Sequence, residues 1–190
     1  MFDLTFSRWT AGLSPEKAVL SIFEKIREIP YAVIPELNDT VRYINILRYG
    51  KGSCMPKHLL LGRMCERLGF PILYSVYPFR WDQKNINYPP PVRRLAEKLP
   101  VSRHLACRIN INNDYVLVDS TLDTGLEKAG LPVNKSWDGV SNTLLPVMPT
   151  GDEEIYHSSE ASLSRHEVPD QIHMEFYTIL NHWLNEVRLF

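Results

Sequence analysis

The stretch around Cys54 constrains the fold more than any other part of the chain. Gly50 and Gly52 interrupt regular structure, and an amphipathic pattern begins directly after them. Ser53 stands where a helix-capping hydroxyl is preferred. Pro56 falls in the first turn, where a missing amide hydrogen costs little. The sequence therefore predicts a helix that has Cys54 at its N-terminal tip.

That helix is expected to end at Gly69, which readily adopts the left-handed conformation that closes many helices. Apolar residues recur along it at helical spacing. They are Leu60, Leu61, Met64, Cys65 and Leu68. This stripe predicts that the helix packs on a core, with Cys65 inside the core.

Three other segments have helical signals. Ser14 and Pro15 form a good helix start, and the helix should end before Pro30 because the residue before a proline disfavours helical geometry. A shorter helix is predicted over residues 39–48. A C-terminal helix is predicted over about 170–189, where one wide apolar stripe requires burial against the body.

Strands are predicted over residues 71–79, 105–111 and 115–119, with turn chemistry at 112–114. Residues 82–103 are expected to form a long loop or a loop with a short helix, and the run Tyr88-Pro89-Pro90-Pro91 disfavours regular structure there. Residues 149–168 are polar and predict an irregular surface excursion.

The predicted hairpin carries His104 and, 15 residues later, Asp119. If its turn has two residues, Asp119 lies opposite Ala106 or Arg108, and both share a sheet face with His104. A three-residue turn would place the imidazole and the carboxylate on opposite faces. Cys107 falls on the face opposite His104 and is predicted to be a core residue.

A cysteine, a histidine and an aspartate form the minimum set for a thiolate nucleophile. A thiol ionises more readily at a helix N-terminus beside an imidazolium. The helix amides, including that of Cys54, can bind the oxyanion of a tetrahedral intermediate. Asp119 would fix the tautomer of His104 and stabilise the imidazolium. A buried structural role is the simpler alternative for Cys54 taken alone.

The residues Gly52-Ser53-Cys54, His104 and Val118-Asp119-Ser120-Thr121 resemble the transglutaminase-like superfamily. The resemblance covers about residues 40–125. It implies an α+β fold with a papain-like core, in which a nucleophile helix packs on an antiparallel sheet, here with extra N- and C-terminal helices. The chain departs from the family pattern at Ala106, Tyr115 and Leu122, where the family often has Trp, Trp and Pro.

The resemblance implies cysteine-dependent acyl chemistry at an amide, either hydrolysis or acyl transfer, on a peptide, a protein or a small amide, without a cofactor. Two alternatives remain open. One is an arylamine acetyltransferase-like enzyme, although nothing marks a coenzyme A site. The other is a catalytically silent binding module that keeps the fold.

Four more residues are candidates for the surroundings of the site. His58 lies four residues after Cys54 on the same helix face and is expected to line or brace the site. A metal pair of these two residues is disfavoured because no second pair with zinc spacing is present. Tyr43 and Tyr49 are candidates for completing the oxyanion hole, and Trp81 for contacting substrate.

The overall properties exclude several classes of protein. The 190 residues suit one domain spanning 1–190. A net charge of -1 argues against a dedicated nucleic-acid binder. Neither a secretory signal nor a membrane-spanning apolar run is recognisable. Three cysteines without a scaffold pattern favour reduced thiols in the cytoplasm.

Overall fold

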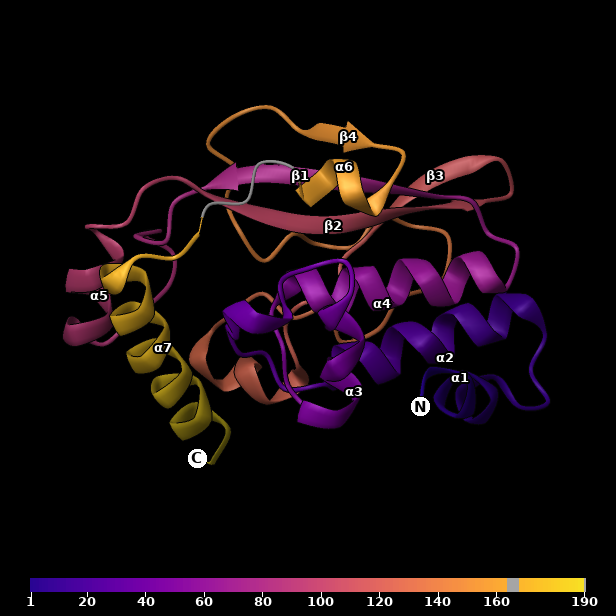
Figure 1. Cartoon of the computed structure of the whole chain (residues 1–190), viewed down its shortest axis with the longest axis horizontal. Helices are drawn as coiled ribbons and strands as arrows, with labels where there is room; N and C mark the ends of the chain where they lie inside the picture. The colour runs from indigo at the N-terminus through magenta and orange to yellow at the C-terminus, as the bar shows by residue number, and fades with distance from the viewer. Residues whose placement is uncertain (164–167, 190) are drawn as a thin grey trace.

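The computed structural model describes residues 1–163 and 168–189. They form an α+β structure around a four-stranded antiparallel sheet in the order β3-β2-β1-β4 (Figure 1). The strands are β1 (Ile72–Phe79), β2 (Ser102–Ile111), β3 (Asp114–Val118) and β4 (Glu154–Tyr156). The first three confirm the predicted strands. Strand β4 was not predicted, because three residues are too few to show an alternating pattern.

The β2–β3 hairpin has the two-residue turn that the pairing of His104 with Asp119 requires. Asn112 and Asn113 have φ values of 52° and 72°, which a tight hairpin turn needs and asparagine tolerates. The paired residues run from Ile111 opposite Asp114 to Cys107 opposite Val118. One step further along this register, Asp119 faces Ala106, two residues from His104 on the same strand.

Helix α4 (Cys54–Arg67) packs on one face of the sheet, as predicted. Its residues Leu60, Leu61 and Met64 are fully buried and share a core with Leu105 and Cys107 of β2. Helices α2 (Pro15–Arg27) and α1 (Phe2–Thr10) lie on the side of α4 away from the sheet (Figure 1). Helix α1 lacks a side-chain cap, so its start had no local signal.

The helix ends follow most of the predicted signals. The Lys17 amide donates to the Ser14 hydroxyl at 3.5 Å, and Gly69 has a φ of 92° just after α4. Ser53 occupies the predicted cap position, but the predicted hydrogen bond from its side chain to the helix does not form. Ser53 precedes α4, but its hydroxyl donates to Asn38 Oδ1 at 2.9 Å and not to the helix.

The helix predicted over 39–48 is wrong in extent. The chain forms a 3-10 turn, η2 (Arg42–Asn45), and one α-helical turn, α3 (Ile46–Tyr49). The Asp39 carboxylate accepts hydrogen bonds from the Val41 and Arg42 amides, which delays the helical start.

A second apolar cluster lies under the C-terminal helix α7 (Gln171–Leu189), which confirms the predicted final helix. Phe176, Leu180 and Leu184 of α7 are buried there. The cluster also includes residues of α5 (Pro90–Ala96) and η3 (Thr124–Ala129). Helix α5 is the short helix that the sequence allowed within 82–103. It begins inside the proline run that was expected to disfavour regular structure, because prolines in a first helical turn lose no hydrogen bond.

The segment 149–168 is partly regular. It contains β4, which pairs with β1, and α6 (Ser159–Leu163), while residues 164–167 lie outside the described part. The short 3-10 turn η1 (Pro35–Leu37) follows α2. No helix in the described ranges is both long and apolar enough to cross a bilayer.

Candidate active site

Cys54 is the first residue of α4, and its side chain is half-buried at the edge of a cavity. The first amides of a helix have no partner within the helix, and they carry its positive dipole end. Cys65 and Cys107 are instead fully buried in the core, as predicted. Cys54 is thus the cysteine that a molecule entering this cavity can reach.

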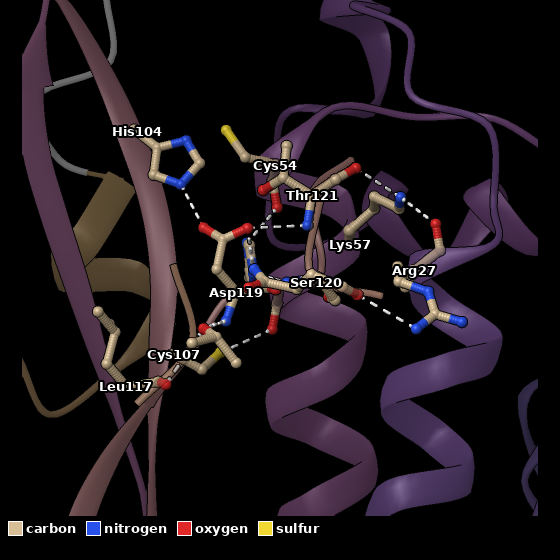
Figure 2. A network of polar contacts seen from close by, with 12 residues as sticks. Arg27, Cys54, Lys57, His104, Cys107, Leu117, Asp119, Ser120 and Thr121 are labelled. Atoms are coloured by element: carbon tan, nitrogen blue, oxygen red, sulfur yellow. Dashed lines mark hydrogen bonds and ion pairs between the residues drawn. The ribbon is translucent and has the colours of Figure 1, made fainter. Parts of the chain in front are cut away.

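His104 connects Cys54 to Asp119. The imidazole Nε2 lies 2.5 Å from Asp119 Oδ2, and both residues are almost fully buried. The Cys54 sulfur lies beside the ring, on the side away from Asp119 (Figure 2). Nδ1 is therefore the ring nitrogen left to face the thiol.

The surrounding charges favour a protonated imidazole. Burial alone would lower the pKa of His104, but the negative charges of Asp119 and Cys54 outweigh it and raise the pKa to about 10. In turn, the His104 charge lowers the pKa of the Asp119 carboxyl despite its burial. The arrangement favours an aspartate–imidazolium pair whose free N–H is directed at the sulfur.

The Asp119 carboxylate is held by its own chain segment. Oδ1 accepts from the Thr121 amide at 2.9 Å, while Oδ2 faces His104. The backbone of Asp119 is fixed on both sides, by Thr143 Oγ1 at 2.8 Å and by Asn134 Nδ2 at 3.0 Å. These contacts set the orientation of the carboxylate before any ligand binds.

His58 braces this arrangement from within α4. Its Nδ1 lies 2.9 Å from the Cys54 carbonyl oxygen, and its Nε2 accepts from the Ser120 amide at 3.0 Å. Because an amide can only donate, Nε2 is unprotonated and Nδ1 carries the hydrogen. Burial lowers the pKa of His58 to about 4, so the ring is neutral. Fully buried, His58 braces the site and does not line the cavity.

Lys57, beside His58, is also completely buried. Its ammonium donates to the carbonyl oxygens of Thr121 at 2.6 Å and Arg27 at 2.9 Å (Figure 2). Burial lowers its pKa to about 7, although the charge of Asp123 acts in the opposite direction. Nothing in the local sequence signalled this role.

The cavity beside Cys54 has a volume of about 340 Å³. Its walls come from the start of β2, the end of β1, the loop before α5, and α7. Trp81 lines it, as predicted, together with Cys54, His104 and Asn38.

The structure does not bring Tyr43 and Tyr49 to this cavity. Tyr43 is buried, and its hydroxyl accepts from Arg63 at 3.2 Å beside a different hollow. Tyr49 is 49% exposed at the end of α3. Asn38 lines the cavity instead, and its Oδ1 accepts a hydrogen bond from the Ser53 hydroxyl.

A second ion pair, buried on the Asp123 side and partly buried at Arg188, connects α7 to the site. Arg188 donates to Asp123 through Nε at 2.9 Å and through a terminal nitrogen at 2.6 Å. The Tyr31 amide donates to the same carboxylate at 2.7 Å. The two partners are 65 residues apart, so sequence patterns gave no sign of the contact.

Among the described residues, no group of three or more His, Cys, Asp or Glu is arranged to hold a metal ion.

Comparison with known proteins leaves the family open. No family profile matches the chain, and no curated protein is significantly similar to it. Among the solved structures that match is a candidate cysteine protease from Cytophaga hutchinsonii, with 13% identity and a TM-score of 0.46. The match covers 83% of this chain and 46% of that protein, so this chain spans about half its length. The geometry of the site is therefore the basis for assigning a function.

Proposed function

We propose that this protein catalyses cysteine-dependent acyl chemistry at an amide, with Cys54, His104 and Asp119 as its catalytic triad. The observation that carries the proposal is the position of His104 between the Cys54 sulfur and the Asp119 carboxylate, at the edge of a cavity (Figure 2). A nucleophile, a base and a group that orients the base, all in contact, are the signature of nucleophilic catalysis.

In the first half of the reaction, the Cys54 thiolate attacks the carbonyl carbon and a C–S bond forms. The carbonyl electrons move to oxygen, which becomes the oxyanion. His104 Nδ1–H then protonates the leaving nitrogen as the C–N bond breaks. The products are a free amine and a thioester on Cys54.

In the second half, water attacks the thioester while His104 accepts its proton. The tetrahedral intermediate collapses, releases the carboxylic acid and returns the thiolate and the imidazolium. An amine in place of water would give acyl transfer by the same steps. We favour hydrolysis because water needs no acceptor site of its own.

Two donors suit the oxyanion. One is the Cys54 amide at the tip of α4, supported by the helix dipole. The other is the side-chain amide of Asn38, which lines the cavity and is oriented by Ser53. Both groups are positioned before the substrate binds, which is the condition under which oxyanion stabilisation is strong.

The fold is compatible with this proposal. A helix with the nucleophile at its tip packs on an antiparallel sheet that carries His104, with Asp119 just beyond the paired strand. This is the arrangement implied by the resemblance to the transglutaminase-like superfamily. We extend the proposal to a papain-like core of that type within a single domain. The acetyltransferase-like and silent-module alternatives become outcomes of the test.

The test is to trap the acyl-enzyme. Wild-type protein mixed with 4-nitrophenyl acetate, quenched in acid and analysed by mass spectrometry should carry one acetyl group on Cys54. Cys65 and Cys107 serve as internal controls, since both thiols are buried. His104→Ala should abolish the adduct. A folded wild-type protein that forms no adduct on Cys54 would support the silent module and overturn the proposal. Retention of the acetyl group until an arylamine is added would support the acetyltransferase alternative.

A further inference from the structure

The cavity beside Cys54 is lined mainly by apolar side chains, and six of the lining residues are Phe, Tyr or Trp. They come from distant parts of the chain and surround the same space. The aromatic residues are Tyr31, Phe79, Trp81, Tyr88, Tyr177 and Trp183. Burial raises the pKa of both Tyr31 and Tyr177, and Cys54 adds a smaller effect in the same direction.

The aromatic walls hold one another in place. Trp183 meets the ring of Tyr88 edge-on with centroids 5.3 Å apart, and Trp81 packs on Phe176 at 5.0 Å. The Trp81 indole N–H donates to Ser102 at 2.9 Å. The cavity is therefore shaped before a ligand enters, which lowers the entropy lost on binding.

The lining offers little to a charged ligand. Of the described residues that line it, none is an aspartate or a glutamate. Arg103 already has an interaction partner, and His173 lies 2.7 Å from the Asp170 carboxylate. A cationic group would lose its hydration here without meeting a carboxylate, and the cations that an anion would meet, His104 and Arg103, already have partners.

We propose that the substrate carries an uncharged aromatic or bulky apolar group next to the carbonyl that Cys54 attacks, and that this group fills the aromatic cavity. This inference rests on the proposed function of Cys54. A volume of about 340 Å³ is near the lower end of small-molecule sites, which span roughly 300–1,000 Å³. It suits one ring system better than an extended peptide.

The experiment compares three alkylating reagents that differ only in one substituent. They are N-methyl, N-benzyl and N-carboxymethyl iodoacetamide, which carry the variable group on the amide nitrogen, and each rate is corrected for the rate with free cysteine. Rates at Cys54 are followed by mass spectrometry on the whole chain. The benzyl reagent should react about tenfold faster than the methyl reagent, since burying a ring provides that much binding. The carboxymethyl reagent should gain nothing.

A pair of variants on α7 locates the effect. Trp183→Ala removes one wall and should reduce the benzyl preference to less than about threefold. His182→Ala is the matched control. His182 is the neighbour of Trp183 in the chain, but its side chain is 76% exposed and does not line the cavity. The control should keep the full preference.

The outcomes separate this inference from the function on which it rests. Equal corrected rates for the methyl and benzyl reagents at a reactive Cys54 would overturn the aromatic pocket and leave the chemistry standing. A carboxymethyl reagent that reacts faster than the methyl reagent would overturn the uncharged pocket and favour an anionic substrate. No reaction at Cys54 with any reagent would overturn both.

Discussion

The Lys57 ammonium donates to the Thr121 carbonyl oxygen at 2.6 Å, and both residues are buried next to the candidate active site. Thr121 also supplies the amide that holds the Asp119 carboxylate. The second acceptor of Lys57 is the carbonyl of Arg27, the last residue of α2. One side chain thus connects two helices to the segment that positions Asp119.

Replacing Lys57 with Met should lower the free energy of unfolding by about 1–3 kcal/mol, because two buried carbonyls lose their donor. It should also reduce turnover, because the segment that carries Asp119 is less constrained. Urea denaturation and steady-state kinetics measure the two effects. Lys51→Met, at an exposed position, is the control with the same change in charge and should be close to neutral.

The effect of Lys57 on stability should depend on pH. Its pKa is about 7 in the folded protein and 10.5 in the reference state, so between these values the unfolded chain binds more protons. The free energy of unfolding of wild type, relative to Lys57→Met, should therefore rise as the pH increases from 7 towards 10. An equal difference at pH 6 and pH 9 would contradict the buried-amine account.

His58→Phe should lower the free energy of unfolding by about 1–3 kcal/mol at pH 7, because the buried Ser120 amide loses its acceptor. The pKa of His58 is about 4 when folded and 6.5 in the reference state. The stabilising contribution is therefore complete above pH 6.5 and decreases as the pH falls towards 4. Denaturation of both proteins at pH 7 and pH 5 tests this, with exposed His182→Phe as the control. A difference that grows on acidification would contradict a neutral His58.

Arg188→Met should loosen α7 from the rest of the protein. It leaves the buried Asp123 carboxylate without its guanidinium partner, which should cost about 2–4 kcal/mol. Hydrogen exchange should increase along α7, and KM should rise because α7 forms one wall of the cavity. Glu186→Gln on the same helix is the control, since its side chain is 54% exposed. Unchanged exchange in α7 would show that the ion pair does not hold the helix.

Asn38→Ala should reduce kcat by about 10²–10³-fold with a small effect on KM, as expected for loss of one oxyanion donor. Ser53→Ala should give a smaller decrease, because it only frees the Asn38 side chain to rotate. Exposed Glu36→Ala, two residues away, is the control. Equal kcat in Asn38→Ala and wild type would remove Asn38 from the proposed mechanism.

Local chemistry predicted the parts of the fold that depend on neighbouring residues. Ser14 and Pro15 mark the start of α2, Gly69 marks the end of α4, and two asparagines set the hairpin turn. The two-residue turn also predicts that His104 and Asp119 share a sheet face. Each of these signals lies within a few residues of the feature that it determines.

Contacts between distant segments escaped prediction. Lys57 contacts a carbonyl 64 residues away, and Arg188 contacts a carboxylate 65 residues away. Asn38 lines the cavity and accepts a hydrogen bond from Ser53, which lies 15 residues later. A charged or polar residue in sequence gives no indication that it will be buried, since burial depends on partners that only the folded chain supplies.

Selective alkylation of Cys54 tests the central claim most directly. With iodoacetamide at pH 6, wild type should be labelled at Cys54 at least about tenfold faster than His104→Ala, because the imidazolium stabilises the thiolate. Cys65 and Cys107 should stay unlabelled in both folded proteins. Slow labelling of Cys54 at the same rate in wild type and His104→Ala would contradict the proposed thiolate–imidazolium pair.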